Sequence, residues 1–348
     1  MPHLDLAAAQ ALFDPQPGWL NTASYGLPPR PAVQAVQEAL EIWRHGSASW
    51  EPWDESTSQA RASFARLVGV PVSRVAVGGT VSELTGLVAA ALPDGARVVV
   101  PEVEFTSNLF PWMVHADRGV EVVTVPTAQL IGAITPGTAL VAFGVVQSAT
   151  GEVLPYDDVI AAARAVDALV VADATQAVGW LPVDASQVDA LACGGYKWLL
   201  SPRGTAFLTV GDRLQERLRP LSAGWYAGAD VHSSYYGPPL RLAEDARRFD
   251  VSPAWFSWVG TAPALELLER VGIEAVHDHD VALANRFRAG LGLEPADSAI
   301  VSASVPGASE RLERAGIRAA SRAGSLRVSF HLYSTEADVD AALEALLG

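Results

Sequence analysis

The sequence predicts an α/β fold: a mostly parallel central sheet with helices on both faces, followed by a smaller C-terminal α+β domain. Through the middle of the chain, short β-branched runs alternate with helical patterns, which is typical of βαβ units. The chain has 348 residues, of which 50% are hydrophobic, so it can bury a large core and support a second, smaller domain. After residue 250, helical stretches and one alternating run replace the earlier pattern.

Five apolar runs are predicted to be buried strands: residues 97–103, 120–125, 139–146, 168–174 and 204–210. Helical patterns over residues 82–92 and 156–166 lie between them, and residues 211–260 are irregular. In the last part we expect a helix over 262–271, a long helical stretch to Arg288, a strand over 325–333, and a helix from Glu336 capped by Thr335.

We expect three parts along the chain. Residues 1–30 form an N-terminal segment that packs near the active site, residues 31–250 form the large domain, and residues 251–348 form the small domain. The boundary is placed in the irregular region rich in Gly, Pro and aromatic residues, because linkers between domains have this composition.

The composition disfavours several classes of protein. A formal net charge of −15 argues against a nucleic-acid partner, because an acidic surface repels phosphate backbones. The single cysteine, Cys193, cannot form a disulfide framework or a cysteine-based zinc site, and we expect no metal. Residues 1–10 lack a signal-peptide pattern, and no apolar run approaches the length of a membrane span. We therefore expect a soluble, cytoplasmic protein without a membrane partner.

Three polar features stand at the ends of predicted strands, where ligands bind in open α/β sheets. The stretch GGTVSE at 78–83 precedes a helix, so its N–H groups and the helix dipole suit a phosphate. Asp173 ends an apolar strand, where a carboxylate needs a cation or several donors. Lys197 lies between Tyr196 and Trp198, on the expected following strand, and desolvation there would lower its pKa.

Each feature alone has an ordinary alternative. Residues 78–83 could form a simple helix cap, Asp173 could cap the next segment, and Lys197 could pack its stem while its amine reaches water. Together, the three features meet the requirements of pyridoxal 5'-phosphate. The turn would hold the phosphate, the aspartate would keep the pyridine nitrogen protonated, and the lysine would hold the aldehyde as a Schiff base.

Further segments give the chain a resemblance to a known family, the class V aminotransferase group of fold type I pyridoxal-phosphate enzymes. The segments are LNTASYGLPP at 20–29, EFTSNLFPW at 104–112, DATQAVG at 173–179 and LRVSFHLYST at 326–335. The group includes kynureninase, isopenicillin N epimerase-like proteins and cysteine desulfurases. The resemblance covers nearly the whole chain and implies an aspartate-aminotransferase-like fold, with residues 31–250 binding the cofactor.

The resemblance also implies roles for individual residues. Lys197 would bind the cofactor aldehyde, Asp173 the pyridine nitrogen and Gln176 the phenolic oxygen of the ring. Phe105 would stack on the ring face, unless it belongs to the core. The N–H of Val81, with Ser82 and Tyr196, would hold the phosphate, although Tyr196 could instead bond a backbone group.

For the substrate, the resemblance implies that the planar guanidinium of Arg327 binds the α-carboxylate; the alternative is an ion pair with a surface acid. Ser24 and Tyr25 of the N-terminal segment would line the substrate site. Residues 45–53, HGSASWEPW, would form a mobile loop whose His45, Trp50 and Trp53 make an aromatic substrate pocket. Clustered tryptophans are also common in packing, and this alternative stays open.

Two segments imply a homodimer with shared active sites. SAGWYAG at 222–228 resembles a kynureninase-like stretch whose tryptophan reaches the cofactor phosphate of the neighbouring subunit, which assigns Trp225 to that role. RRFDVSPAW at 247–255 resembles a second inter-subunit segment and assigns Ser252.

The sequence leaves several types of reaction possible. Cysteine desulfurases that resemble this chain carry a nucleophilic cysteine shortly before the C-terminal arginine, but residues 316–327 contain none, which disfavours that activity. Gln176 and Ala23 stand where kynureninase has histidine and asparagine, which argues against kynureninase itself. We expect an aminotransferase acting on a small amino-acid-like molecule. A β-lyase or an epimerase of the same fold is the alternative.

Two alternatives belong to other classes. A catalytically silent binding protein would not need Lys197, Asp173 and Arg327 together. A nucleotide-dependent enzyme on a doubly wound sheet would carry a glycine fingerprint, but the chain has no GxGxxG at its first strand and no GxxxxGK[ST].

Overall fold

The computed structural model describes residues 3–348, and its main element is a seven-stranded sheet in the order β1-β7-β6-β5-β4-β2-β3. The strands are β1 (Val75–Gly78), β2 (Arg97–Pro101), β3 (Glu121–Val125), β4 (Thr138–Gly144), β5 (Leu169–Asp173), β6 (Ala190–Gly194) and β7 (Ala206–Val210). Neighbouring strands are parallel except at β7, which runs antiparallel to β1 and β6. The mostly parallel sheet predicted from the sequence is confirmed.

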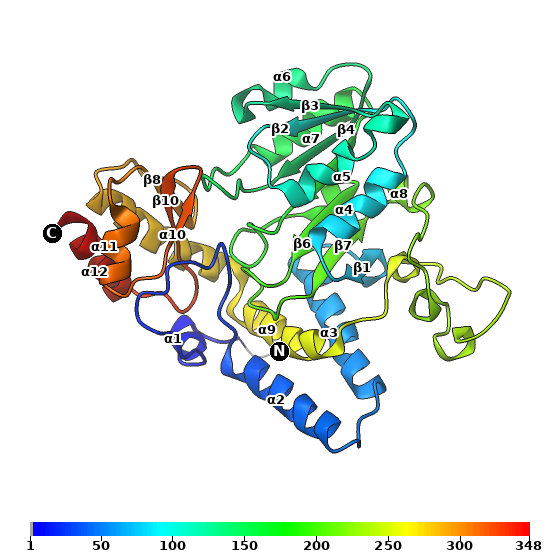
Figure 1. Ribbon diagram of the computed structural model, residues 1–348, viewed down its shortest axis with the longest axis horizontal. Coiled ribbons are helices and arrows are strands. Elements are labelled where there is room, and N and C mark those ends of the chain that lie inside the picture. Colours follow the sequence, from blue (N-terminus) through cyan, green and yellow to red (C-terminus); the bar gives the residue numbers. More distant parts are fainter. Residues whose placement is uncertain (1–2) are drawn as a thin grey trace.

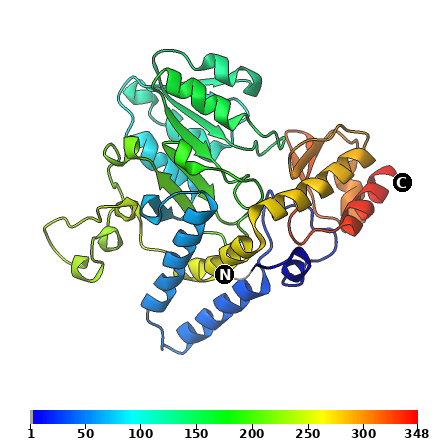
Figure 2. The same ribbon diagram turned by 180° about the vertical axis from the view of Figure 1, so that it is seen from behind.

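Helices cover both faces of this sheet, as Figures 1 and 2 show from opposite sides. They are α3 (Glu51–Leu67), α4 (Val81–Ala90), α5 (Phe110–Met113), α6 (Leu130–Ala133), α7 (Tyr156–Ala165), α8 (Asp212–Gln215) and α9 (Trp255–Val271). Successive side chains of a strand point to opposite faces, so Val98 of β2 joins Leu84 of α4 in one core cluster. On the other face, Phe64 of α3 stacks on Phe207 of β7 at 4.2 Å between ring centroids.

A second, smaller unit of structure follows α9, to one side of the large sheet in Figure 1. It contains an antiparallel sheet in the order β8-β10-β9, formed by β8 (Ile300–Ala303), β9 (Ala320–Arg322) and β10 (Ser325–Ser329). Its helices are α10 (Ile273–Gly290), α11 (Ala308–Arg314) and α12 (Glu336–Leu347). The predicted cap of the last helix is confirmed, because Thr335 Oγ1 accepts a hydrogen bond from Asp338 N at 3.3 Å.

The N-terminal segment, with α1 (Leu6–Gln10) and α2 (Arg30–Arg44), connects the two parts. Asn21 forms a bridge to Ser329 of β10, and Leu20 is buried in the core of the small sheet. A few residues later, Gly26 N donates to the carbonyl of Tyr196 at 3.0 Å. A Cβ at Gly26 would lie 1.9 Å from the carbonyl oxygen of Lys197, so only glycine allows this close approach.

Several local predictions are wrong. No ranges were predicted for β1 and β6, because VAVG is very short and ALACG lacks β-branched residues. Lys197 is not on a strand, since β6 ends at Gly194 and the lysine lies in the turn that follows. The helix predicted over 262–271 is the second part of α9, which begins at Trp255. Trp53 lies on α3, so residues 45–53 are only partly a loop.

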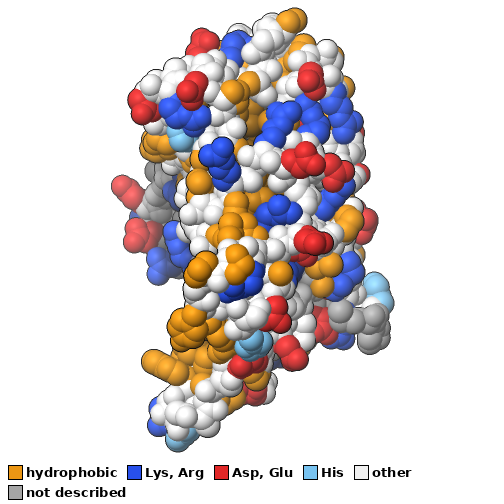
Figure 3. All heavy atoms as spheres, turned by 90° about the vertical axis from the view of Figure 1, so that its right-hand side faces the viewer, with side chains coloured by type: hydrophobic (Ala, Val, Ile, Leu, Met, Phe, Trp, Pro, Cys, Tyr) orange, Lys and Arg blue, Asp and Glu red, His pale blue; other side chains and the backbone are white. Residues whose placement is uncertain are grey.

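The surface mixes charged and apolar side chains. Figure 3 shows acidic and basic groups interspersed on one face, with hydrophobic side chains gathered in its lower part, at the level of α2 and α3 in Figure 1. On α2, the side chains of Val33, Leu40, Ile42 and Trp43 are exposed. Of the helices in residues 3–348, none is both long and apolar enough to cross a membrane.

Candidate active site

A cavity of about 190 Å³ lies at the carboxyl ends of β4, β5 and β6. Its wall contains seven residues predicted from the sequence: Val81, Ser82, Phe105, Asp173, Gln176, Tyr196 and Lys197. They meet because parallel strands end at one edge of a sheet, where Gly144 of β4 pairs with Asp173 of β5. A larger groove of about 940 Å³ runs beside the start of α7 and contains none of these residues.

Lys197 is the only lysine of the chain, and its side chain enters the cavity. The residue is 6% exposed, and its Nζ lies 5.3 Å from the ring centroid of Phe105 and 5.7 Å from that of Tyr196. Burial lowers the pKa of the amine to about 8; Asp173 opposes this shift and Arg327 adds to it. A neutral amine, which is the form that attacks an aldehyde, is thus accessible near physiological pH.

Asp173 is the last residue of β5 and is buried at the floor of the cavity. Its Oδ1 accepts a hydrogen bond from Thr175 N at 2.8 Å. Burial raises the pKa of the carboxyl, while Thr175 and the charge of Lys197 act in the opposite direction. A cationic group placed in the cavity would favour the ionised carboxylate, as a protonated pyridine nitrogen does.

The N-terminus of α4 forms one wall of the cavity. Thr80 caps this helix, its Oγ1 accepting from Glu83 N at 3.2 Å, and Val81 and Ser82 form the first turn. Backbone N–H groups of a first turn have no partner within the helix and carry the positive end of its dipole. Arg203, also in the wall, has its guanidinium 4.8 Å from the ring centroid of Tyr196. This wall therefore suits an anionic group such as a phosphate.

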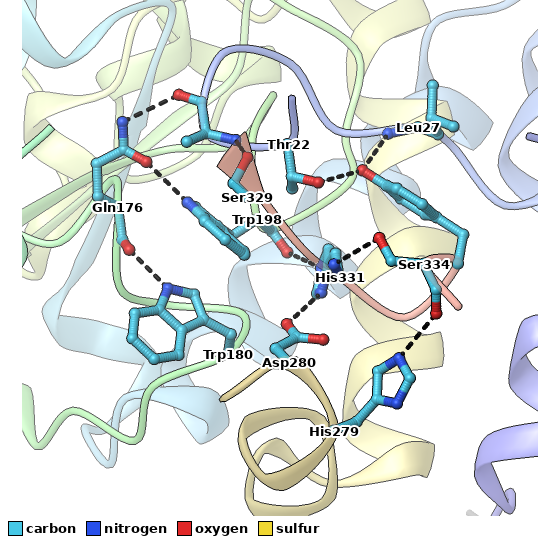
Figure 4. A network of polar contacts seen from close by, with 12 residues as sticks. Thr22, Leu27, Gln176, Trp180, Trp198, His279, Asp280, Ser329, His331 and Ser334 are labelled. Carbon is cyan, nitrogen blue, oxygen red and sulfur yellow. Dashed lines mark hydrogen bonds and ion pairs between the residues drawn. The ribbon is translucent and has the colours of Figure 1, made fainter. Parts of the chain in front are cut away.

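Gln176 is held in one orientation by its partners (Figure 4). Its Oε1 accepts from the indole Nε1 of Trp198 at 2.8 Å, and an indole N–H can only donate. Its Nε2 donates to the carbonyl of Ala23 at 3.0 Å and to Ser148 Oγ at 2.9 Å. The amide nitrogen is thereby directed toward Ser148, which also lines the cavity.

A buried pair of His331 and Asp280 supports the turn that carries Lys197 (Figure 4). His331 Nδ1 lies 3.0 Å from Asp280 Oδ2, and Nε2 lies 3.0 Å from the carbonyl oxygen of Trp198. Because that carbonyl can only accept, Nε2 is the donor of this contact, and Nδ1 faces the carboxylate. The residue after Lys197 is thus tied to the segment that follows β10 and, through Asp280, to α10.

Arg327, on β10, lies behind the cavity wall and is 1% exposed. Its Nη1 donates to the carbonyl and the hydroxyl of Ser148, and its Nη2 donates to Ser24 Oγ at 2.7 Å. The expected alternative, an ion pair with a surface acid, is absent within residues 3–348. Tyr25 stands beside the cavity, its ring centroid 5.9 Å from that of Tyr196.

The remaining predicted residues do not line the cavity of the same chain. Trp50 packs against Trp225 and Trp255 with centroid distances of 5.2 and 5.5 Å, and Trp53 packs against Phe256 at 5.1 Å. Ser252 lies in a neighbouring hollow that shares the walls formed by Gly79 and Gly204 with the cavity. Any role of Trp50, Trp53 or Trp225 at a cofactor thus requires a second subunit or a rearrangement.

The residues of the cavity wall that were missed in the sequence include three with polar or charged side chains of interest: Glu104, Ser148 and Arg203. Glu104 Oε2 accepts from Gly144 N at 2.5 Å, and its pKa is raised to about 7 by burial and then by Asp173. Glu104 lies in the same segment as Phe105, and Arg203 in the same segment as Lys197. Nearness in the sequence to these predicted site residues was the signal that could have identified them. Ser148 follows β4. The only signal for it is that ligands bind beyond the carboxyl ends of strands in open α/β sheets.

The donor groups of the cavity fit pyridoxal 5'-phosphate. The buried amine of Lys197 suits the aldehyde, the carboxylate of Asp173 suits the pyridine nitrogen, and the N-terminus of α4 suits the phosphate. Phe105 is 46% exposed, so it is not a core residue and is free to stack on a planar ring. Within the described part of the chain, no three His, Cys, Asp or Glu side chains are gathered as a metal site.

Comparisons with known proteins agree with this chemistry. A family model described as aminotransferase class-V matches residues 33–305. The chain is 28% identical to the uncharacterized aminotransferase YcbU of Bacillus subtilis, with 91% of this chain and 90% of the relative covered. It is 29% identical to isopenicillin N epimerase of Streptomyces clavuligerus over 98% of both chains. It is 30% identical to kynureninase of Deinococcus radiodurans, with 82% of this chain and 77% of the relative covered.

Solved structures support the fold. A cystine C–S lyase named C-DES, solved with its reaction product cysteine persulfide, superposes with a TM-score of 0.86 at 22% identity, covering 95% of this chain and 97% of that one. A cysteine desulfurase of Thermococcus onnurineus superposes with a TM-score of 0.82 at 22% identity, covering 94% of this chain and 93% of that one. The chain therefore belongs to the class V aminotransferase family and is an enzyme of the pyridoxal-phosphate-dependent, fold type I class.

Proposed function

We propose that this protein is an aminotransferase that moves the amino group of an amino acid or related amine by means of Lys197 and pyridoxal 5'-phosphate. The observation that carries the proposal is the setting of Lys197, a buried amine with a pKa lowered to about 8 at the strand edge occupied by Asp173. A lysine with its head in water would not be 6% exposed.

In this proposal, the bound cofactor supplies an aldehyde and an electron-withdrawing ring that stabilises negative charge at the substrate α-carbon. Lys197 would move a proton at that carbon as a general base and then as a general acid. Asp173 would keep the pyridine nitrogen protonated, and Phe105 would hold the ring plane. Arg327 would fix the substrate α-carboxylate through its planar fork, which selects the bond that breaks.

The relatives include an aminotransferase, an epimerase and a kynureninase, so a β-lyase or an epimerase is the alternative reaction. A cysteine desulfurase is disfavoured. The segment 316–327 has no cysteine, and the only one in the chain, Cys193, is fully buried on β6. Burial also raises the pKa of its thiol well above the ordinary value, which opposes formation of a nucleophilic thiolate.

We also propose that the enzyme is a homodimer with shared active sites and that it works in the cytoplasm. The exposed apolar side chains of α2 offer a surface for a second copy. Trp225 and Ser252, which lie outside the cavity of their own chain, would then complete the partner's cofactor site. The single cysteine suits a reducing compartment.

The reaction is tested by incubating the cofactor-loaded protein with L-amino acids, with and without 2-oxoglutarate, and identifying the products by mass spectrometry. An aminotransferase yields a new amino acid and a new 2-oxo acid in equal amounts, only when the acceptor is present. Inverted configuration without amino transfer would favour the epimerase, and a cleaved side chain would favour the β-lyase. If Lys197→Ala is as active as the wild type, the proposal is wrong.

A further inference from the structure

Two arginines converge on one hydroxyl group beside the cavity. Arg327 Nη2 donates to Ser24 Oγ at 2.7 Å, and Arg322 Nη2 donates to the same atom at 3.3 Å. Arg322 is on β9 and Arg327 is on β10, neighbouring strands of one hairpin, so the backbone itself holds the two guanidinium groups close together. Like charges so placed repel each other, and a neutral hydroxyl does little to offset the repulsion.

Neither guanidinium has an anionic partner. Within residues 3–348 no carboxylate lies within salt-bridge distance of either group; Arg322 also bonds the carbonyl of Ser321, and Arg327 bonds Ser148. The Nε of Arg327 has no hydrogen-bond partner although the side chain is 1% exposed. A buried, unpaired charge is unfavourable, and a site that holds one is prepared for a ligand of opposite charge.

The charge of Arg322 reaches the cavity. Burial lowers the pKa of Arg327, and the charge of Arg322 lowers it further. The charge of Arg322 also contributes to the lowered pKa of Lys197. Arg322 is exposed on the hairpin, whereas Arg327 is buried behind Ser148. Ser148, which accepts from Arg327, lines the cavity, and Ser24 links Arg327 to the exposed Arg322. This local excess of positive charge stands in a chain whose net charge is −15.

We propose that Arg322 binds a second anionic group of the substrate, so that the substrate is a dicarboxylic α-amino acid. This inference rests on the proposed function, in which Arg327 takes the α-carboxylate. The side-chain carboxylate then faces Arg322 at the mouth of the site. An apolar or aromatic side chain there would leave the Arg322 guanidinium uncompensated, which disfavours such substrates.

Isothermal titration calorimetry with succinate and butyrate tests the second anion site without any reaction, because neither compound has an amine. The protein is saturated with pyridoxal 5'-phosphate, and the wild type is compared with Arg322→Gln and with the control Arg314→Gln. Arg314 is exposed on α11 and, within residues 3–348, bonds only the carbonyl of Glu310, so the control removes the same charge away from the site. We expect succinate to bind about tenfold more tightly than butyrate in the wild type and the control.

In Arg322→Gln the ratio of the two dissociation constants should fall to about one, mainly through weaker succinate binding. A ratio of one in the wild type, or an undiminished ratio in Arg322→Gln, would overturn the inference. Titrating the cofactor absorbance with L-aspartate against L-asparagine, and L-glutamate against L-glutamine, should give the same preference for the acids. If the protein forms no cofactor band, the proposed function fails, while calorimetry on the purified protein still decides whether Arg322 selects a second carboxylate.

Discussion

Arg61 and Arg327 are two almost fully buried arginines with opposite surroundings. Arg61, on α3, is 4% exposed and donates to both oxygens of Asp250, at 2.6 and 3.2 Å. Arg327 is 1% exposed and, among the described residues, bonds only to neutral oxygens of two serines. Burial opposes the charged form of both, but Asp250 outweighs it and raises the pKa of Arg61, whereas the pKa of Arg327 is lowered to about 10.

This difference distinguishes two kinds of buried charge: one forms an ion pair that stabilises the fold, and the other has no ion pair and can bind a ligand of opposite charge. Asp250 also accepts from Val77 N on β1 at 2.8 Å, so its ion pair joins α3 to the sheet. Beside the cavity, the buried charges of Glu104 and Arg327 have no ion-pair partner within residues 3–348. Glu104 accepts only from backbone N–H groups and the Gln147 amide, although it is 8% exposed. Such charges cost stability unless a ligand neutralises them.

The largest effect is expected from breaking the paired charge. Asp250→Ala leaves Arg61 buried and uncompensated, and should lower the free energy of unfolding of the cofactor-free protein by about 3–5 kcal/mol. Arg327→Met removes a charge that has no ion pair, and should change the same quantity by less than about 1 kcal/mol. Urea unfolding measures both. Equal losses in the two variants would remove the distinction between the arginines.

Glu104→Gln should flatten the pH dependence of stability of the cofactor-free protein. Burial, then Asp173, raises the pKa of Glu104 from 4.5 to about 7. Between these values the folded state binds more protons than the unfolded state, so the wild type loses stability as the pH rises. Relative to the Gln variant, the loss should reach about 3 kcal/mol between about pH 4.5 and pH 8. Urea unfolding at a series of pH values measures this free energy. If it changes with pH by the same amount in both proteins, the raised pKa is contradicted.

Arg327→Met should have its effect on ligand binding. Loss of the bidentate contact to a carboxylate should weaken binding of an amino-acid substrate by about a hundredfold, measured by titrating the cofactor absorbance. The corresponding amino-acid amide, which has no α-carboxylate, should bind the wild type and the variant about equally. If the variant weakens the amide as much as the acid, Arg327 does not bind the α-carboxylate.

The smallest effect is expected at a neutral pair near the site. Tyr333 Oη and Thr22 Oγ1 are 2.6 Å apart and buried, joining the N-terminal segment to the chain after β10. Tyr333→Phe leaves the Thr22 hydroxyl without this partner and should cost about 1–2 kcal/mol of stability, with little change in ligand affinity. Tyr25→Phe, at an exposed ring, serves as the matched control in the same urea series. A loss as large as that of Asp250→Ala would show that charge pairing is not what distinguishes these contacts.

The large sheet was largely predictable because β-branched runs such as those of β2 and β5 fit buried parallel strands. Strand β6 escaped prediction, since ALACG consists of small residues that packing alone keeps extended. The small sheet was predicted only through β10, because β8 and β9 are short and depend on pairing with it.

The centre of the site was predictable for a similar reason: Asp173 ends a strand, and Lys197 stands in an apolar setting that suits no ordinary lysine. The paired arginines were not. Arg322 and Ser24 are 298 positions apart, and no local pattern brings them together. Glu104 could not be recognised for another reason: its raised pKa depends on burial and then on Asp173, and strand β4 lies between β2, which Glu104 follows, and β5, which Asp173 ends.

The central claim is that Lys197 holds the cofactor, and the absorbance spectrum tests it most directly. The purified protein is titrated with pyridoxal 5'-phosphate, reduced with borohydride and digested for mass spectrometry. The account predicts a band at about 410–430 nm in the wild type, none in Lys197→Ala, and a reduced adduct on the peptide that contains Lys197. Because this is the only lysine of the chain, no other lysine can give the signal. A wild type without the band, or an equal band in Lys197→Ala, would contradict the account.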